Sequence, residues 1–292
     1  MDFDTWHRNG NFFEHRGERV FYQHGGSGRG DALLCIHGFP TASWDWHALW
    51  PALTQRFGVV LAPDLLGFGW SAKPRDYAYS VLDQADLCEG LLREHAITRV
   101  HVLAHDLGDS VAQELLAREV ERGVPGATAS MVLLNGGLFP ETHRPRPIQR
   151  LLLMPLGALL SRLQNRRNFG VRFSAVFGRD TQPSARELDE FWQLIAHADG
   201  AAIAHRLIRY IPERRQQRER WVAALQRAPM PLRLIAGLDD PVSGAHMVAR
   251  YRELIAPADV VELPGIGHYP QVEATAAVLQ ALNDFYMLTA SG

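Results

Sequence analysis

Short apolar runs alternate with amphipathic stretches along most of this chain. Runs such as Leu33–Ile36 contain no polar side chain, which is typical of a strand covered on both faces. Stretches such as Val81–His95 repeat apolar residues at the spacing of an amphipathic helix. The predicted strands are Arg19–Gln23, Ala32–Ile36, Val59–Ala62, Val100–Ala104, Ser130–Leu134, Leu232–Ala236 and Val260–Leu263; the predicted helices are Ser43–Leu53, Val81–His95, Ser110–Val120, Gly244–Ile255 and Ala274–Leu288. This alternation predicts an α/β fold with a mostly parallel sheet flanked by helices.

The alternation stops between residues 138 and 228, where the sequence is helical in pattern, rich in arginine and without a convincing strand. We therefore predict a helical cap over 138–228, inserted into a core formed by 1–137 and 229–292. The cap contains the apolar run Leu151–Leu160, which is too short to span a bilayer and is broken by Pro155 and Gly157. We expect this run to be a core helix, with an exposed patch as the alternative.

Composition narrows the classes of protein and partner. The 292 residues are 47% apolar and 21% charged, which is ordinary for a globular enzyme. A net charge of −2 gives no electrostatic reason to expect nucleic acid or an anionic membrane as a partner. The N-terminus lacks the apolar region of a signal peptide, and no run is long enough for a transmembrane segment. Cys35 and Cys88 suggest neither a disulfide framework nor a metal cluster, so we expect a cytoplasmic protein.

The segment Val102–Ala112 predicts a strand-to-helix turn that presents one reactive side chain. Asp106 lies at its centre, with the small residues Ala104 and Gly108 two positions away on either side. This is the pattern of a nucleophile elbow, in which the backbone passes too close to its neighbours for larger residues. An aspartate, with an ordinary pKa of about 3.9, is already ionised at neutral pH and needs no base before it attacks. An ordinary turn is the alternative for this motif taken alone.

Two later loops carry the partners that such a nucleophile needs. Asp239 and Asp240 follow the strand that ends at Ala236, and His268 lies in the loop before the last helix. In a parallel sheet these loops meet at the carboxyl ends of the strands. The chain order of nucleophile, acid and histidine is the order found in α/β hydrolases. No metal-ligand spacing and no glycine-rich dinucleotide motif is present, so we expect no cofactor.

Several segments together resemble one superfamily: His37–Pro40, Asp64–Arg75, His105–Leu116, Asn135–Pro145, Gly237–Val242 and His268–Glu273. The chain resembles the α/β-hydrolase superfamily, specifically its aspartate-nucleophile branch of epoxide hydrolases and haloalkane dehalogenases. Within that branch it is most similar to the hydrolases grouped with mesoderm-specific transcript protein. The resemblance implies an α/β-hydrolase fold with a cap and a small apolar substrate. It leaves the oligomeric state open, with a homodimer among the alternatives.

The resemblance also implies roles for individual residues. Asp106 would attack an sp3 carbon and form a covalent ester, and His268 would activate the water that hydrolyses this ester. Asp240 would orient His268, with Asp239 as the less favoured candidate. The backbone N–H groups of Phe39 and Leu107 would form the oxyanion hole. The residues expected at the substrate site are His37, Trp192, Phe177 and Tyr269, with a structural hydrogen-bonding role as the alternative for His37.

The leaving group separates the candidate reactions. Epoxide opening needs an acid, usually a tyrosine pair in the cap, and Tyr210 is the only tyrosine between residues 138 and 228. Phe173 and Phe177 lie where the second tyrosine is expected, so His143, His197 and His205 are alternative acids. A dehalogenase usually has a tryptophan after the nucleophile, where this chain has Leu107; Trp192 and Trp221 are alternative halide donors. We favour epoxide hydrolysis over dehalogenation, and keep a weakly catalytic or non-catalytic binding protein as a third hypothesis.

Overall fold

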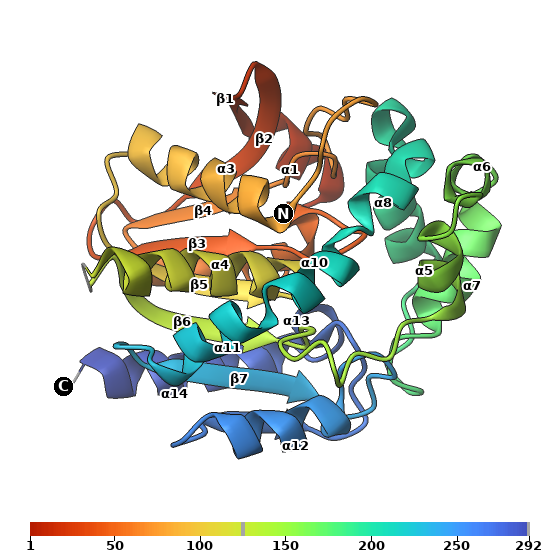
Figure 1. Cartoon of the computed structure of the whole chain (residues 1–292). Coiled ribbons are helices and arrows are strands. Elements are labelled where there is room, and N and C mark those ends of the chain that lie inside the picture. Colours follow the sequence, from red (N-terminus) through yellow and green to blue (C-terminus); the bar gives the residue numbers. More distant parts are fainter. Residues whose placement is uncertain (124–125, 291–292) are drawn as a thin grey trace.

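The computed structural model describes residues 1–123 and 126–290 and has an eight-stranded sheet at its centre (Figure 1). The strands are β1 (Asn11–His15), β2 (Glu18–Gly25), β3 (Ala32–Ile36), β4 (Val59–Pro63), β5 (Val100–His105), β6 (Thr128–Leu134), β7 (Leu232–Gly237) and β8 (Val260–Leu263). Their order across the sheet is β1-β2-β4-β3-β5-β6-β7-β8. β2 pairs antiparallel with β1 and β4, and every pair from β4 to β8 is parallel. The predicted mostly parallel sheet is therefore confirmed.

Helices cover both faces of the sheet, which is why its central strands are apolar throughout. Leu33 and Cys35 contribute to one buried cluster, and Leu34 and Ile36 to the other, because successive strand residues point to opposite faces. Helices α3, α4 and α12 pack against one cluster, and α2 and α14 against the other. The helices outside the region between β6 and β7 are α1 (Phe3–Arg8), α2 (Trp50–Arg56), α3 (Val81–Glu94), α4 (Leu107–Arg122), α12 (Ala245–Leu254), α13 (Pro270–Glu273) and α14 (Thr275–Ala290), with a 3-10 turn η1 (Ser43–Trp46).

The structure differs from the predicted elements at several places. Strand β1 and helix α1 were not predicted, because both are short and neither has a long apolar pattern. The predicted helix Ser43–Leu53 is instead the 3-10 turn η1 followed by α2, whose first turn contains Pro51. Proline is favoured at the first positions of a helix, so it marks the start of a new helix here. Helix α4 begins at Leu107, three residues before the predicted start.

Between β6 and β7 the chain forms helices and connecting segments only, which all lie in the described part. These are α5 (Pro147–Leu152), α6 (Gly157–Arg162), α7 (Arg166–Ser174), α8 (Ala185–Ala196), η2 (His197–Ile203), α9 (Ala204–Leu207), α10 (Tyr210–Gln216) and α11 (Arg218–Gln226). The last of them, α11, packs along α4 of the core, and its Trp221 donates a hydrogen bond to Glu114 of α4 at 2.8 Å. The division into a cap of 138–228 and a core remains a prediction, because α11 is part of the helical layer on the sheet.

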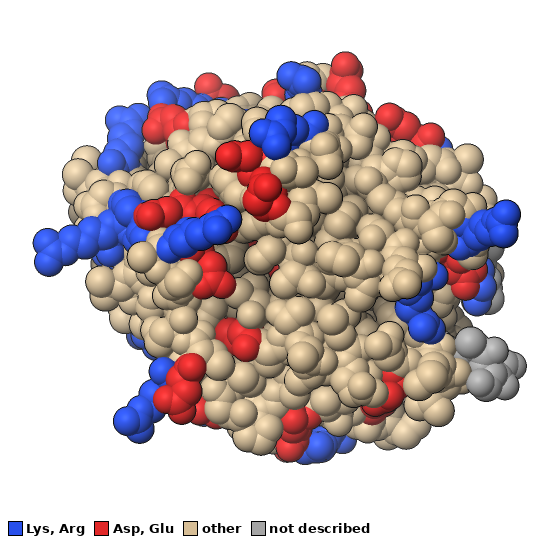
Figure 2. All heavy atoms as spheres, turned by 180° about the vertical axis from the view of Figure 1, so that it is seen from behind, with Lys and Arg blue, Asp and Glu red and all other residues tan. Residues whose placement is uncertain are grey.

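Figure 2 shows the molecule from behind, with acidic and basic side chains intermixed over this face. No large field of one sign covers it, as the small net charge of −2 leads one to expect. In the described part of the chain, no helix combines the length and the apolar character needed to cross a membrane. Charge is less evenly distributed along the sequence, since residues 142–179 contain arginines but no aspartate or glutamate.

Candidate active site

Asp106 lies on a sharp turn between β5 and α4. Its backbone has φ 47° and ψ −102°, a conformation that a residue other than glycine adopts at a cost in strain. The turn requires small neighbours: a Cβ atom on Gly108 would lie 2.2 Å from the carbonyl oxygen of Ile36, and one on Gly38 would lie 2.9 Å from the Asp106 Cβ. The strain and the close packing hold the carboxylate at the carboxyl edge of the sheet, above the first turn of α4.

Three predicted side chains converge at this edge. His268 lies in the loop after β8, and its Nδ1 is 2.8 Å from Oδ2 of Asp240, in the loop after β7. Its other ring nitrogen, Nε2, lies 4.0 Å from Oδ2 of Asp106. All three side chains are buried. The carboxylate that reaches His268 belongs to Asp240, whereas Asp239 accepts a hydrogen bond from the N–H of Gly265 at 3.1 Å.

Asp240 is held by several donors besides His268. Oδ1 accepts from the N–H of Val242 at 2.7 Å, and Oδ2 accepts from the Asn135 amide at 3.0 Å and the Ser243 hydroxyl at 2.8 Å. Burial alone would raise the pKa of Asp240, but the His268 charge and these donors lower it to about 2. Asp240 is therefore ionised and fixed in orientation, as an acid that orients a histidine must be.

His105, the last residue of β5, bonds to the backbone of His268. Its Nε2–H donates to the backbone carbonyl oxygen of His268 at 2.8 Å. Burial and the nearby His268 charge lower the pKa of His105 to about 3, so its ring is neutral at physiological pH. The hydrogen bond therefore fixes the loop that carries His268 without adding a charge.

The backbone beside Asp106 supplies donors for negative charge. The N–H of Phe39, which follows β3, donates to Oδ2 of Asp106 at 3.1 Å. Leu107 is the first residue of α4, and the first N–H groups of a helix have no partner within the helix. The Phe39 N–H therefore points at the Asp106 carboxylate, and an oxyanion hole formed by the Phe39 and Leu107 N–H groups stays a prediction.

A buried arginine from α10 contacts Asp106 and was not predicted. The Nη2 of Arg214 lies 2.7 Å from the backbone oxygen and 3.2 Å from Oδ1 of Asp106, and its Nε donates to the Ser110 hydroxyl at 2.6 Å. The residue is 1% exposed, and Tyr210 covers the guanidinium with its ring centre at 4.5 Å. Arg214 is separated from Asp106 by 108 positions, and nothing in its local sequence distinguishes it from neighbouring arginines.

Charge decides the protonation states of the pair Asp106 and His268. Burial raises the pKa of Asp106, but the charges of Arg214 and His268 outweigh this and hold the pKa below its ordinary value. Burial likewise lowers the pKa of His268, but the Asp240 and Asp106 carboxylates raise it to about 9. In the free protein at neutral pH, Asp106 is therefore a carboxylate and His268 is an imidazolium.

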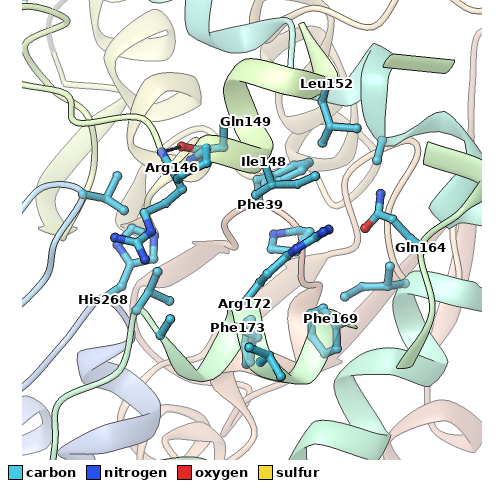
Figure 3. Close-up of a pocket in the computed structure, with 18 of the residues that line it drawn as sticks. Phe39, Arg146, Ile148, Gln149, Leu152, Gln164, Phe169, Arg172, Phe173 and His268 are labelled. Atoms are coloured by element: carbon cyan, nitrogen blue, oxygen red, sulfur yellow. Dashed lines mark hydrogen bonds between the residues drawn. The ribbon is translucent and has the colours of Figure 1, made fainter. Parts of the chain in front are cut away.

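A cavity of about 350 Å³ opens above Asp106 and His268. Apolar side chains dominate its walls, including Phe39, Phe169 and Phe173, as expected for a site that holds a small apolar ligand. Figure 3 shows Arg172 extending across the cavity from α7, and Arg146 reaching from the start of α5 toward His268. The polar amides on the wall are Gln149 and Gln164.

His37, predicted at the substrate site, does not line this cavity among the described residues. Its ring is fully buried, with Nδ1 donating to the Gly38 oxygen at 2.8 Å and Nε2 accepting from the Leu65 N–H at 2.9 Å. Both ring nitrogens are therefore occupied by backbone groups. The substrate-binding prediction for His37 is wrong, and the alternative of a structural hydrogen-bonding role describes it.

The other predicted substrate residues divide in the same way. Tyr269 lines the cavity and donates its hydroxyl hydrogen to the Phe39 oxygen at 3.2 Å. Phe177 and Trp192 do not line it among the described residues; Phe177 stacks on Tyr269 with ring centres 5.2 Å apart. These two rings support the aromatic wall from behind, so we correct their assignment from substrate contact to packing.

Tyr210 is buried beside the cavity and is not one of the described residues that line it. Its ring packs against Phe39 with centres 5.8 Å apart, and its hydroxyl makes no hydrogen bond to any described residue. Burial and the Asp106 charge raise the pKa of the phenol, a rise that the neighbouring Gln149 side chain opposes. The phenol is therefore protonated. It lies behind the cavity wall, next to Gln149, which is part of that wall.

The sequence suggested alternative acids and halide donors. In the described part of the chain, none of them lines the cavity: His143, His197, His205, Trp192 and Trp221. The Trp221 indole is already occupied by Glu114. Burial lowers the pKa of His143 to about 4, so this ring is neutral. No group of three or more metal-ligating side chains in residues 1–123 and 126–290 could hold a metal ion.

Comparison with known proteins gives matches over nearly the whole chain. The pattern of the alpha/beta hydrolase family matches residues 33–281. Mesoderm-specific transcript protein of Mus musculus is 40% identical over 290 residues, spanning 96% of this chain and 87% of the relative. The LipZ protein of Mycobacterium tuberculosis is 43% identical over 257 residues, spanning 87% of this chain and 88% of the relative.

Solved structures agree on the fold. A haloalkane dehalogenase DbeA loop variant from Bradyrhizobium elkanii superposes with a TM-score of 0.82 at 22% identity and covers 97% of each chain. At this identity the likeness shows the fold alone. The α/β-hydrolase fold predicted from the sequence is confirmed, and the chain belongs to the alpha/beta hydrolase family.

Proposed function

We propose that this hydrolase opens epoxides to vicinal diols through a covalent ester on Asp106. The observation that carries the proposal is a carboxylate at the elbow, facing Nε2 of a histidine whose Nδ1 is paired with Asp240 at 2.8 Å. A serine at this position would need a base in order to attack, whereas an ionised carboxylate attacks directly. The apolar cavity above Asp106 suits a small apolar electrophile.

In the first step, the Asp106 carboxylate attacks one epoxide carbon. A C–O bond to Asp106 forms, the ring C–O bond breaks, and the resulting alkoxide takes a proton. We assign that proton to Tyr210, because its phenol is protonated, lies next to Gln149 and has no hydrogen-bond partner among the described residues. Arg214 is a positioning residue in this step, because it keeps Asp106 ionised and oriented.

In the second step, water hydrolyses the ester. Esterification removes the negative charge of Asp106, and this charge helps to keep His268 protonated in the free protein. The pKa of His268 falls as a result, so its ring releases its proton, and by way of solvent this proton converts the Tyr210 phenolate left by the first step back to the phenol. The neutral ring can then take a proton from water. That water attacks the carbonyl carbon of the ester, and the oxyanion accepts from the Phe39 and Leu107 N–H groups. The C–O bond between Asp106 and the diol breaks, and His268 gives its proton to the product oxygen. The Asp106 carboxylic acid that remains passes its proton to His268, which restores the starting carboxylate and imidazolium.

Dehalogenation is the less supported reaction for this site. A leaving halide needs N–H donors, but Leu107 follows the nucleophile and no tryptophan lines the cavity in the described structure. The indole of Trp221 donates to Glu114, away from the cavity. A non-catalytic binding protein would differ from an epoxide hydrolase and from a haloalkane dehalogenase because it would bind its ligand without converting it to a product.

The proposal predicts where solvent oxygen enters in the first turnover. One turnover of an accepted epoxide in heavy-oxygen water, with protein in excess, is expected to give unlabelled diol and labelled Asp106. The reason is that water attacks the ester carbonyl carbon, so the substrate receives its oxygen from the carboxylate. Mass spectrometry of the diol and of the peptide containing Asp106 measures both. The substrate is first chosen from a panel of styrene-type, aliphatic and cyclic epoxides.

The same panel includes haloalkanes and esters as controls. Label in the first-turnover diol would show direct attack of water on the epoxide and would exclude the covalent route. Turnover of haloalkanes but not epoxides would replace the proposed reaction by dehalogenation. Tight binding of an epoxide without any diol would favour the non-catalytic hypothesis.

Tyr210→Phe is expected to slow ring opening and leave ester hydrolysis little changed. Removing the phenol takes away the proton donor of the first step, a loss of about 10²-fold for a general acid. Rapid-quench mass spectrometry separates the rates at which the ester forms and disappears. Tyr251→Phe is the matched control, because the Tyr251 hydroxyl is also buried without a partner among the described residues but lies on α12. Equal rates of ester formation in native protein and Tyr210→Phe would remove Tyr210 from the mechanism.

A further inference from the structure

The apolar run Leu151–Leu160 is exposed, which corrects the expectation of a core helix. Six large apolar side chains around it are 40–64% exposed, and we call them the cap patch: Leu151, Leu153, Met154, Leu156, Leu159 and Leu163. Leu152 in the same run is 3% exposed and faces inward. A contiguous apolar surface of this kind marks an interaction site more often than scattered exposed residues do.

The cap patch is concentrated at one place in the molecule. Eleven large apolar side chains are exposed in the described structure, and the six of the patch plus Val171 make seven of them. They come from α5, α6, α7 and the segments that join these helices, which stand together on the right of Figure 1. The C-terminal helix α14 lies on the opposite side of that view, so its exposed Leu288 belongs to a separate surface.

The charge of this part of the chain is entirely positive. Residues 142–179 contain eight arginines and no aspartate or glutamate, although the whole chain has a net charge of −2. Among the described residues, only Arg166 of these eight has an ion-pair partner, Asp189. The others include Arg150 and Arg162, which flank the cap patch and are exposed. The small net charge therefore conceals a local surface that attracts anions.

The cap patch borders the mouth of the cavity. Leu152 and Gln164, which adjoin patch residues in the chain, line the cavity wall, as Figure 3 shows. Val171, 70% exposed, lines the same cavity, and its neighbour Arg172 extends across it. An apolar molecule held against the patch would therefore have a short path to Asp106.

We propose that the cap patch docks this protein on the surface of a bilayer that carries anionic phospholipids. Apolar side chains would enter the boundary between headgroups and acyl chains, and the surrounding arginines would bind the headgroup phosphates, as in other interfacial segments. Given the proposed function, the bilayer would supply apolar epoxides directly to the cavity. This contact is peripheral and needs no helix that crosses the membrane.

A second copy of the chain fits the same surface less well. In a two-fold dimer the same patch lies on both subunits and faces itself. Such a contact would bring the unpaired arginines of residues 142–179 on one subunit close to those on the other, with no acidic residue in that segment to compensate. An anionic bilayer complements both the apolar residues and the charge.

The test is co-sedimentation of the native chain with vesicles of phosphatidylcholine, with and without about one fifth phosphatidylglycerol. We expect binding to the anionic vesicles, and a loss of about tenfold or more between 50 and 300 mM salt, because screening shortens electrostatic attraction. Leu156→Ser should weaken binding about fivefold, because one apolar anchor is lost. Arg162→Glu should weaken it about tenfold, because two units of charge change near the headgroups.

Matched controls separate the patch from general surface changes. Leu288→Ser alters a leucine that is 69% exposed, against 64% for Leu156, on α14, which lies on the other side of Figure 1 from the cap patch. Arg29→Glu makes the same charge change at an exposed position outside the cap. Both should bind vesicles as the native chain does. None of the four variants should change turnover of a water-soluble epoxide, so vesicle binding is measured independently of the reaction.

Three results would overturn the proposal. One is no binding to anionic vesicles at low salt. A second is equal binding by native chain, Leu156→Ser and Leu288→Ser. A third is a native dimer, seen by light scattering, that Leu156→Ser converts to a monomer, since the patch would then be a contact between two copies. Vesicle binding by a chain that hydrolyses no epoxide would support the docking surface and reject only the proposed function.

Discussion

His268→Gln is expected to give a protein that reacts once with an epoxide and then stops. Asp106 can still attack, because its carboxylate needs no base, but no group remains to activate water. Loss of a general base typically slows a step by about 10²–10⁴-fold, so the ester should accumulate to nearly one equivalent. Intact-protein mass spectrometry should show the native mass plus one epoxide, and digestion should place the added mass on Asp106.

Two variants control this result. Asp106→Asn removes the nucleophile and should show no adduct with the same epoxide. His197→Gln alters an exposed histidine of the same region and should turn over without accumulation. An adduct that forms equally in Asp106→Asn would place the reaction on another side chain. The absence of any adduct in His268→Gln, with an epoxide that the native chain accepts, would contradict the covalent mechanism.

The pKa of His268 gives this order of events a physical cause. In the free protein, Asp240 and Asp106 raise the pKa of His268 to about 9, so the ring carries a proton and cannot act as a base at neutral pH. Formation of the ester neutralises Asp106 and so removes one of the carboxylates that raise the pKa of His268, and that pKa falls. Formation of the ester on Asp106 therefore turns His268 into the base that hydrolyses this ester.

Much of the fold could be predicted from the sequence, because its central strands are buried on both faces. Four consecutive apolar residues at Leu33–Ile36 indicate such a strand without any tertiary information. The turn at Asp106 was also recognisable from its small neighbours, and the structure gives the reason at Gly108, where a Cβ atom would lie 2.2 Å from the carbonyl oxygen of Ile36. The loops of Asp240 and His268 then meet because parallel strands end at the same edge.

The features that were not predictable depend on contacts between distant residues. The run Leu151–Leu160 has no polar face, so its pattern could not distinguish a buried helix from an exposed patch. His37 follows a strand like a site residue, but its ring nitrogens bond to backbone at Gly38 and Leu65. Arg214 lies among other arginines, and only the folded chain distinguishes the one that reaches Asp106.

Arg214→Met is expected to shift the acid limb of ring opening, which is the fall in the rate of ester formation at low pH, to higher pH. Asp106 is buried, which by itself raises its pKa, and the Arg214 charge is the largest influence that lowers it. An arginine beside an aspartate typically lowers the aspartate pKa by about 1–3 units. Without it, protonated Asp106 should accumulate at a higher pH, so the rate of ester formation should fall as the pH drops from 7 to 5, a range over which we expect the native rate to be constant. Single-turnover rates at a series of pH values measure this limb.

Stability must be separated from this effect on the site, because Arg214 is 1% exposed and its removal leaves the Ser110 hydroxyl and the Asp106 carboxylate without their partner. Breaking one side of a buried ion pair costs about 3–5 kcal/mol of folding free energy. Arg233→Met is the matched control. Arg233 lies on β7 and is not among the described residues that line the cavity; it is 7% exposed, and its guanidinium pairs with the Asp259 carboxylate at 2.9 Å. It should lower the melting temperature and leave the acid limb in place.

Arg214→Lys completes the comparison, because it restores the charge without the planar guanidinium. A lysine ammonium can pair with one oxygen of Asp106 but cannot bond Asp106 and Ser110 together as the guanidinium does. The acid limb should therefore return toward the native pH, while the ester-formation rate at neutral pH stays below native because the carboxylate is less well oriented. An acid limb that stays at the native pH in folded Arg214→Met would show that Arg214 only holds α10 against α4, with no influence on the nucleophile.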